Sequence, residues 1–274
     1  MTDVGYETAV GASPAVASPE HVADARWPER YDLFGVHVSA TCYDDVVDCV
    51  IDAARSGRPA TVDFMAVHGL VSAIRDPAQR DRLNCFDIIA PDGQPVRWAL
   101  NRFHRAGLTD RVYGPEAMRR LVHAAAEQGI GIYLYGSSQA VIERLRANLQ
   151  HDCPTLTIAG AEPSLFRPLT DEESEALVQR INTSGAGLVF VGLGCPRQEV
   201  FAFEHRERIK AVQLCVGAAF DFHAGTKPMA PAWMQRRGLE WLYRMLTEPG
   251  RLWQRYLITN AIFSFLYLRR LLLN

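Results

Sequence analysis

The stretch from Leu188 to Gly225, LVFVGLGCPRQEVFAFEHRERIKAVQLCVGAAFDFHAG, decides the fold. Its first five residues are uncharged and partly β-branched, which is typical of a strand buried on both faces. The turn Gly192-Leu193-Gly194 follows, and Pro196 suits the first turn of a helix because proline has no N–H to leave unpaired there. A second apolar run, Val212 to Phe220, predicts another buried strand, with Asp221 just past its end.

The rest of the chain continues this alternation of apolar strands and amphipathic helices. We predict further strands at 33–40, 60–64, 86–90, 130–135 and 156–159, and helices at 44–55, 67–74, 95–103, 115–128, 140–149 and 171–183. Strands that alternate with helices favour parallel βαβ units. We therefore expect an α/β protein with a doubly wound, mostly parallel sheet.

A ligand-binding cleft is expected where these strands end, because open α/β sheets bind ligands beyond the carboxyl ends of their strands. Gly192, Gly194, Gln198 and Asp221 follow two successive strands and form the first candidate site. Gly136 ends another strand, and glycine turns in this position can cradle phosphate. The spacing does not match the GxGxxG fingerprint of dinucleotide-binding folds.

Asp92 is the candidate catalytic residue, because it directly follows an apolar strand in the sequence IIAPDG. A carboxylate in this position can act as a general base on a hydroxyl nucleophile. An Asp-Gly turn residue without a catalytic role is the commoner alternative. Asp221 is open to the same ambiguity, since it either orients a ligand or caps the next segment. Gln198 either hydrogen-bonds a sugar or base or lies on a helix surface.

The C-terminal segment differs from the rest of the chain in charge and composition. The whole chain of 274 residues has a net charge of −2, which implies no general polyanion surface and no nucleic-acid partner, whereas residues 236–274 hold seven Arg and two Glu. Arg244, Arg251 and Arg255 would share one helix face, although Pro249 and Gly250 interrupt the helix. Arginine forks match the oxygens of a diphosphate, but a solvated or lipid-facing basic face is about equally consistent.

The expected organisation has three parts: a mobile N-terminal tail at 1–30, a core at 31–235 and a C-terminal appendage at 236–274. The tail is rich in Ala, Ser, Pro and Glu and has no periodicity. The appendage is basic, aromatic and apolar, which is typical of a helix lying on a membrane surface; a helix docked on the core is the alternative. It contains no uninterrupted run of about 20 apolar residues, so no ordinary membrane span is expected.

The cysteines and histidines indicate a reduced protein without a metal site. Six cysteines form no CxxC pair, and no signal peptide is visible, which favours the cytoplasm. Cys195 lies beside the expected cleft, but no partner base can be assigned to it, and packing is favoured over nucleophilic catalysis. Asp221 and His223 form a DxH pair without a second ligand cluster, so we expect no metal.

With these segments assembled, the chain resembles the WecG/TagA/CpsF family of bacterial glycosyltransferases from about Leu33 to Tyr256. The motifs that carry the resemblance are APDG (90–93), RVYG (111–114), GLGCPRQE (192–199), VGAAFDFHAG (216–225) and APAWMQRRGLEWLYRMLTEPGRLWQRY (230–256). The resemblance implies a Rossmann-like core with an appendage that touches both the active site and the inner face of the cytoplasmic membrane. It also implies a peripheral membrane enzyme of surface-polysaccharide or exopolysaccharide synthesis.

The implied reaction is a metal-independent, inverting transfer of a sugar from a UDP-sugar to a polyprenyl-diphosphate-linked sugar, with no cofactor. The donor sugar would be N-acetylmannosamine, its uronic acid or a related hexose. By position, Asp92 matches the family's proposed catalytic base. The matching substrate and nucleotide residues are Arg111, Gln198 and Asp221, and the appendage arginines placed near the diphosphate are Arg244, Arg251 and Arg255.

One departure from the family pattern bears on the substrate. The family usually has Thr-x-Asn near the end of the second strand, whereas this chain has Phe64-Met65-Ala66 there. Because a site that hydrogen-bonds a sugar discriminates strongly through those bonds, the sugar or acceptor remains open. His68, two residues further on, offers a replacement polar contact.

Two other functions remain open at this stage. A nicotinamide-dependent oxidoreductase would use a similar sheet, but the chain lacks its glycine fingerprint. A non-catalytic subunit that binds nucleotide sugars and membranes is kept open by the departure at Phe64 and Ala66. The sequence also leaves open whether the chain forms a homo-oligomer.

Overall fold

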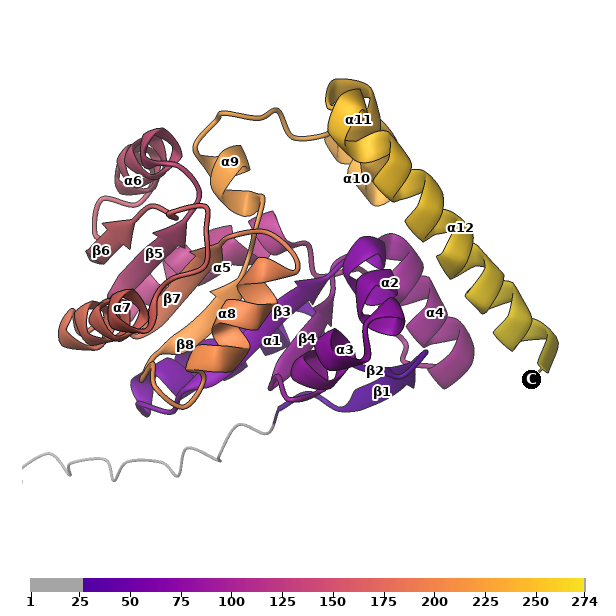
Figure 1. The fold of residues 1–274 in the computed structure, drawn as a ribbon, viewed down its shortest axis with the longest axis horizontal. Helices are drawn as coiled ribbons and strands as arrows, with labels where there is room; N and C mark the ends of the chain where they lie inside the picture. The colour runs from indigo at the N-terminus through magenta and orange to yellow at the C-terminus, as the bar shows by residue number, and fades with distance from the viewer. Residues whose placement is uncertain (1–26, 274) are drawn as a thin grey trace, which may run out of the picture.

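The computed structural model describes residues 27–273, apart from the side chains of Ala232 and Arg251. Six parallel strands form the central sheet, in the spatial order β4-β3-β8-β7-β5-β6 (Figure 1). Their bounds are β3 (Ala60–Met65), β4 (Ile88–Pro91), β5 (Ile132–Gly136), β6 (Ile158–Glu162), β7 (Leu188–Gly192) and β8 (Val212–Cys215). This arrangement confirms the predicted α/β, Rossmann-like fold with a parallel sheet.

Helices cover both faces of this sheet, which explains why its central strands are apolar on both sides. One face packs against α1 (Tyr43–Arg55), α5 (Gly114–Glu127), α6 (Gln139–Asp152) and α9 (Ala219–His223). The other packs against α2 (Val67–Arg75), α3 (Pro77–Asn84), α4 (Gln94–His104), α7 (Asp171–Thr183) and α8 (Arg197–His205). Successive residues of β7 accordingly join opposite core clusters: Phe190 lies in one and Val191 in the other.

The single strand predicted at 33–40 is wrong. The structure has a separate antiparallel hairpin instead, made of β1 (Arg30–Leu33) and β2 (Val36–Ser39). Phe34 and Gly35 both have positive φ angles, 59° and 91°, and Gly35 N–H donates to Asp32 Oδ2 over 2.8 Å. This local turn, with left-handed backbone at both central residues, reverses the chain within the predicted strand.

The prediction that one strand extends from Val212 to Phe220 is also wrong, since β8 ends at Cys215. Gly217 has a φ of +50° and turns the chain into the short helix α9, which contains Asp221. An apolar run does not by itself separate a buried strand from a buried helix, and here it is divided between the two. Asp221 is therefore held in a helical turn above the sheet, not at the strand end.

The C-terminal segment forms three helices, α10 (Ala232–Arg236), α11 (Glu240–Thr247) and α12 (Pro249–Leu273), with the predicted break before Pro249. In Figure 1, α12 runs along the side of the molecule next to α2 and α4. Phe263 packs edge-on against Phe34, and the Arg270 guanidinium lies 4.9 Å from the Phe103 ring centroid. These contacts attach one side of α12 to the core.

The other side of α12 is strongly apolar and exposed. Its exposed large side chains are Trp253, Leu257, Ile258, Phe265, Leu268, Leu272 and Leu273. Contrary to the sequence expectation, the segment from Leu252 to Leu273 is long and apolar enough to cross a membrane, by length and composition only. An 18-residue window within this segment has a mean hydropathy of 1.3.

The predicted N-terminal tail lies almost entirely outside the described residues. Within the described part of the chain, Trp27 is partly buried against the core, and the guanidinium of Arg58 lies 4.3 Å from its ring centroid. Arg30 already belongs to β1. Residues 27–30, which the sequence assigned to the tail, thus contact or belong to the described core.

Candidate active site

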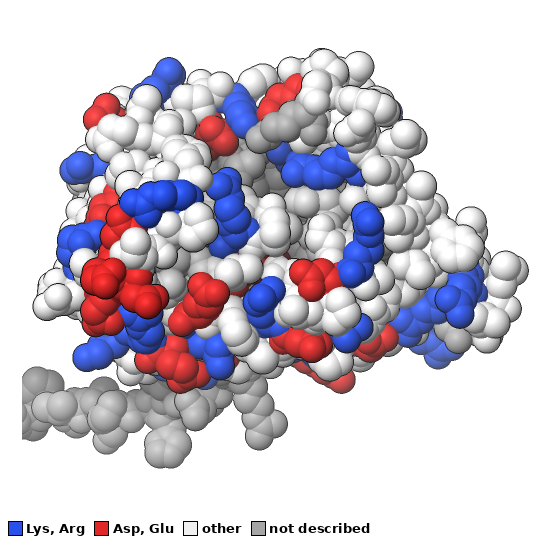
Figure 2. All heavy atoms as spheres, in the orientation of Figure 1, with Lys and Arg blue, Asp and Glu red and all other residues white. Residues whose placement is uncertain are grey.

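A cleft of about 1040 Å³ lies beyond the carboxyl ends of the central strands. One part of its wall comes from the ends of β3, β4, β7 and β8. The other part comes from the C-terminal segment, namely the turn before α11, α11 itself and α12. Figure 2 shows a hollow between the core and the C-terminal helices, with basic and acidic side chains at its rim. The cleft thus forms where the sequence predicted it, but the C-terminal helices supply one wall.

Asp92 lies in this cleft directly after β4. Its Oδ2 accepts a hydrogen bond from Gly114 N–H over 3.2 Å, and its Oδ1 lies 3.7 Å from Arg111 Nη1. Burial raises the pKa of Asp92 to about 6, although the positive charge of Arg111 opposes the rise. A carboxyl with this pKa is mostly ionised at neutral pH and is more basic than a solvated aspartate, as a general base requires.

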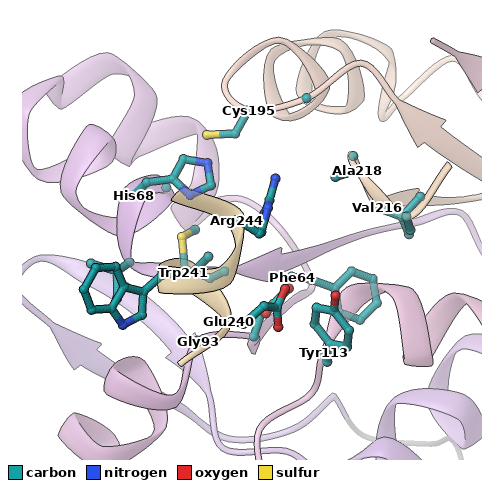
Figure 3. Close-up of a pocket in the computed structure, with 18 of the residues that line it drawn as sticks. Phe64, His68, Gly93, Tyr113, Cys195, Val216, Ala218, Glu240, Trp241 and Arg244 are labelled. Carbon is teal, nitrogen blue, oxygen red and sulfur yellow. The ribbon is translucent and has the colours of Figure 1, made fainter. Parts of the chain in front are cut away.

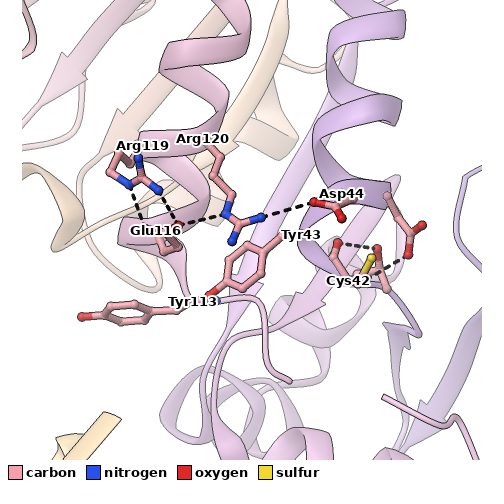
Figure 4. A network of polar contacts seen from close by, with 9 residues as sticks. Cys42, Tyr43, Asp44, Tyr113, Glu116, Arg119 and Arg120 are labelled. Atoms are coloured by element: carbon pink, nitrogen blue, oxygen red, sulfur yellow. Dashed lines mark hydrogen bonds and ion pairs between the residues drawn. The ribbon is translucent and has the colours of Figure 1, made fainter. Parts of the chain in front are cut away.

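A polar network behind the cleft holds the segment that contacts Asp92 (Figure 4). The Tyr43 hydroxyl, from α1, accepts a hydrogen bond from Tyr113 N–H over 2.9 Å. Arg120 lies over the Tyr43 ring and bonds to Asp44 and Glu116. These contacts join α1 to α5 and set the position of Tyr113 and the N–H that follows it.

Arg111 is almost fully buried and is paired within the protein. Its Nη2 donates to Glu240 Oε2 over 2.7 Å, and its guanidinium lies 4.4 Å from the Tyr113 ring centroid. Figure 3 shows Glu240, at the start of α11, beside Tyr113. Arg111 lines the cleft, and its charge is paired with those of Asp92 and Glu240. Its role as a phosphate or substrate contact stays a prediction.

The cationic side of the cleft is formed by Arg244 on α11 and Arg255 on α12. Arg244 Nε is buried and makes no hydrogen bond with any described residue. Burial, followed by the charges of Arg255 and Arg244, lowers the pKa of His68 to about 3. His68 is consequently neutral, with an imidazole available to a hydroxyl group, and Figure 3 shows it on the same side of the cleft as Cys195.

Gln198 connects the glycine turn to the end of β8. Its Oε1 accepts from Gly194 N–H, and its Nε2 donates to Cys215 O, each over 3.2 Å. Gly192 and Gly194 line the cleft, whereas Gly136 does not. The Gly194 N–H and the Gln198 amide therefore bond within the protein and fix the shape of the turn. Their roles in binding a ligand stay predictions.

Beneath this turn lies a pair of buried carboxyls that sequence reasoning missed. Asp63 is 2% exposed and Glu199 is 3% exposed. Burial raises the pKa of Asp63 strongly, and the neighbouring Glu199 charge raises it further. Burial also raises the pKa of Glu199, to about 7. Burial and the neighbouring carboxyl therefore both favour the protonated form of this pair.

Asp221 lines the cleft opposite Asp92, and its environment includes a cation that sequence reasoning also missed. Lys227 Nζ lies 3.5 Å from Asp221 Oδ2 and 3.4 Å from Glu248 Oε2. The lysine thereby links α9 to the junction of α11 and α12. His223, the partner in the DxH pair, is instead hydrogen-bonded to Pro115 O over 2.8 Å and does not line the cleft.

The structure thus brings most of the predicted site residues into one cleft. These are His68, Asp92, Arg111, Gly192, Gly194, Gln198, Asp221, Arg244 and Arg255. The side chain of Arg251 lies outside the described residues. Cys195 lines the cleft, and burial raises its thiol pKa well above the usual value, so it is held as a thiol and packing remains its best-supported role.

Some of the missed residues left a trace in the sequence. Asp63 is an acid in the middle of an otherwise apolar strand, TVDFM, which is unusual for a strand buried on both faces. Glu240 stands at the start of an amphipathic helix, where an acid is ordinarily explained by the helix dipole. Only the folded chain shows that this acid reaches Arg111, which is 129 residues away.

Phe64 and Ala66, which stand where the family usually has Thr-x-Asn, make this part of the cleft wall apolar. Phe64 is 8% exposed and packs against the backbone at Gly114, while Ala66 precedes α2. Both residues line the cleft. Neither side chain can hydrogen-bond a sugar, and His68, the predicted replacement contact, lines the same cleft.

A parallel α/β sheet with helices on both faces and a cleft at its strand ends, lined by a carboxylate and by arginines, defines a Rossmann-like protein. Residues 31–274 match the model of the glycosyl transferase WecG/TagA/CpsF family. The chain is 32% identical over 187 residues to the N-acetylglucosaminyldiphosphoundecaprenol N-acetyl-beta-D-mannosaminyltransferase of Bacillus subtilis (strain 168), covering 68% of this chain and 70% of that protein. The chain therefore belongs to the WecG/TagA/CpsF family of glycosyltransferases, which confirms the resemblance seen in its motifs.

Proposed function

We propose that this protein is an inverting, metal-independent hexosyltransferase that uses a UDP-sugar donor and a polyprenyl-diphosphate-linked saccharide acceptor. The transferred sugar is N-acetylmannosamine, its uronic acid or a related hexose. One observation carries the proposal: in a member of a glycosyltransferase family, a single cleft is lined by Asp92 and by the arginines Arg244 and Arg255. The name of the Bacillus relative supports a lipid-linked acceptor.

The chemical step is a single displacement. The Asp92 carboxylate takes the proton of the acceptor hydroxyl while that oxygen attacks the anomeric carbon, and the bond to the UDP oxygen breaks on the opposite face. Gly114 N–H holds one Asp92 oxygen in place and leaves the other for the incoming hydroxyl. A base positioned in this way typically contributes about 100-fold to 10,000-fold in rate.

The departing diphosphate carries the negative charge that develops in the transition state. Arg244 and Arg255 supply fixed positive charge on the wall of the cleft that the C-terminal helices form. The buried Arg244 Nε, which lacks a hydrogen-bond partner among the described residues, is well suited to a phosphate oxygen. In a site closed to water these charges stabilise the leaving group more strongly than they would in solution.

The acceptor's lipid places the reaction at a membrane, and α12 suits that location. Its exposed side presents large apolar side chains from Trp253 to Leu273, while its buried side carries the cleft residue Arg255. A helix of this kind binds in the plane of the interface with its apolar face among the acyl chains. We infer that the protein associates peripherally with the inner face of the cytoplasmic membrane.

The test is turnover of Asp92→Asn with a panel of UDP-sugars and a short polyprenyl-diphosphate-sugar acceptor. We expect release of UDP by the wild-type protein only when acceptor is present, which also separates an enzyme from a non-catalytic binding subunit. Asp92→Asn should lose turnover by at least about 100-fold and keep UDP affinity in calorimetry. The matched control is Asp48→Asn, an exposed position on α1. Normal turnover by the Asp92 variant would remove that residue from the role of base.

A further inference from the structure

The contact between Glu240 and Arg111 joins the C-terminal helices to the catalytic side of the cleft. Glu240 is the first residue of α11, yet it is only 7% exposed because its carboxylate points into the core. The ion pair with Arg111 is buried on both sides and 2.7 Å long. A carboxylate drawn this far into a protein is costly unless it is paired, so the contact forms only when α11 is seated on the core.

Arg111 is shared unequally between two carboxylates. Its Nη2 is hydrogen-bonded to Glu240, whereas its Nη1 lies 3.7 Å from Asp92 Oδ1, beyond hydrogen-bond distance. The Tyr113 ring lies against the guanidinium and limits where it can move. Without Glu240, the nearest carboxylate left to Arg111 is that of Asp92. A short ion pair between Arg111 and Asp92 would then engage the carboxylate oxygen that has to accept the proton.

We propose that Glu240 is a positioning residue: by binding Arg111 when the C-terminal helices are seated, it prevents a close Arg111–Asp92 pair and keeps the Asp92 carboxylate free to accept the acceptor's proton. The inference rests on the proposed role of Asp92 as base. Glu240 itself gains and loses no proton in the reaction, because the proton passes only from the acceptor hydroxyl to Asp92. The base is therefore competent only in the molecule whose C-terminal helices are closed over the cleft.

The charges around Asp92 give this role a specific signature. Glu240 raises the pKa of Asp92, and Arg111 and Arg244 lower it, in addition to the dominant effect of burial. Asp92 also acts on two tyrosines whose pKa values burial raises, Tyr43 and Tyr113, and on the buried carboxyl of Asp63, whose pKa burial raises strongly. The tyrosines stay neutral throughout the working range of pH, so they do not mask the effect of the two charged neighbours.

The experiment compares pH–rate profiles of the full-length protein with those of Glu240→Gln and Arg111→Gln. Loss of the Glu240 charge should move the acid limb of kcat to lower pH by about 1 unit, with a lower plateau because the base is weaker and more tightly paired. Loss of the Arg111 charge should move the acid limb to higher pH. If Glu240 had a purely structural role, the variants would lose activity, but their acid limbs would not move in opposite directions.

The matched control is Glu248→Gln, which removes an appendage carboxylate that contacts Lys227 and not Arg111; its acid limb should stay in place. If Glu240→Gln does not fold, as judged by circular dichroism, Glu240→Asp keeps the charge but shortens its reach and should give a smaller displacement in the same direction. If the acid limbs of Glu240→Gln and Arg111→Gln stay in place or move in the same direction, the inference about Glu240 is overturned. If Asp92→Asn is inactive in that case, the proposed function still holds. An active Asp92→Asn overturns both.

Discussion

Replacing Gly136 with alanine should strongly destabilise the protein, because two strands approach each other there at backbone distance. Gly136 ends β5 and pairs with Gly192 at the end of β7, and its φ is +127°. A Cβ atom on Gly136 would lie 2.6 Å from Gly192 C and 2.7 Å from Gly192 O. Neither contact can be relieved by rotating a side chain, so the two strand ends must separate.

The expected loss of stability combines two costs. A non-glycine residue in this region of φ costs about 1–3 kcal/mol. Overpacking that moves backbone costs a further 1–3 kcal/mol or so. Gly136→Ala should therefore lower the free energy of unfolding by about 2–6 kcal/mol, a large part of the roughly 5–15 kcal/mol typical of a folded protein. Because Ser137 and Gly192 line the cleft, UDP binding should weaken as well.

The measurement is urea unfolding followed by tryptophan fluorescence, with Gly185→Ala as the matched control. Gly185 also has a positive φ, +72°, but no atom lies within 4 Å of the Cβ it would carry. The control should lose only about 1 kcal/mol, the cost of the backbone conformation alone. If Gly136→Ala is no less stable than Gly185→Ala, the inference that the strand ends are in close contact is refuted.

Three further outcomes follow from the cleft and from α12. Burial raises the pKa of Glu199 from 4.5 to about 7, so the wild-type protein should lose stability as the pH rises between those values. Glu199→Gln removes this loss, and the free energy of unfolding of the variant relative to wild type should therefore rise by up to about 3 kcal/mol between pH 5 and pH 8. A difference in melting temperature between the two proteins that is the same at both pH values would contradict this. The double variant Phe265→Glu/Leu268→Glu on the exposed side of α12 should reduce flotation with anionic liposomes by at least about tenfold, because each of these side chains contributes roughly 1.5–3 kcal/mol when it is buried in the membrane. The control is Leu165→Glu, on the β6–α7 loop, and an equal loss of flotation in that variant would show a nonspecific effect. With a pKa of about 6 for Asp92, the wild-type kcat should fall about tenfold per unit below that pH, and a rate that is constant down to pH 5 would argue against Asp92 as base.

Much of the fold could be predicted because its signals are local. The run 188–192 was predicted as a strand and the run 171–183 as a helix, and both have those bounds in the structure. The two errors in the strands, at Phe34-Gly35 and at Gly217, occur where a left-handed turn divides an apolar run. Hydrophobic periodicity does not report such a turn, since apolar residues continue on both sides of it.

The candidate site was predictable to the extent that its residues stand at strand ends. Asp92, Gln198 and the glycine turn follow strands, and parallel topology brings strand ends to one edge of a sheet. What each residue does there was less accessible. Gln198 was predicted either to contact a ligand or to lie on a helix surface, and the structure adds that its amide bonds to Gly194 and Cys215.

The sequence by itself determined the parallel α/β sheet, the edge of that sheet that binds ligands, the carboxylate that stands there and the family to which the chain belongs. Only the tertiary structure decided which charges meet. Arg111 is paired with Glu240, burial beside Glu199 raises the pKa of Asp63, and Arg244 Nε remains without a hydrogen-bond partner among the described residues. The physical reason is that strands and helices follow from neighbouring residues, whereas a pKa or an ion pair depends on burial and on charges brought together from distant parts of the chain.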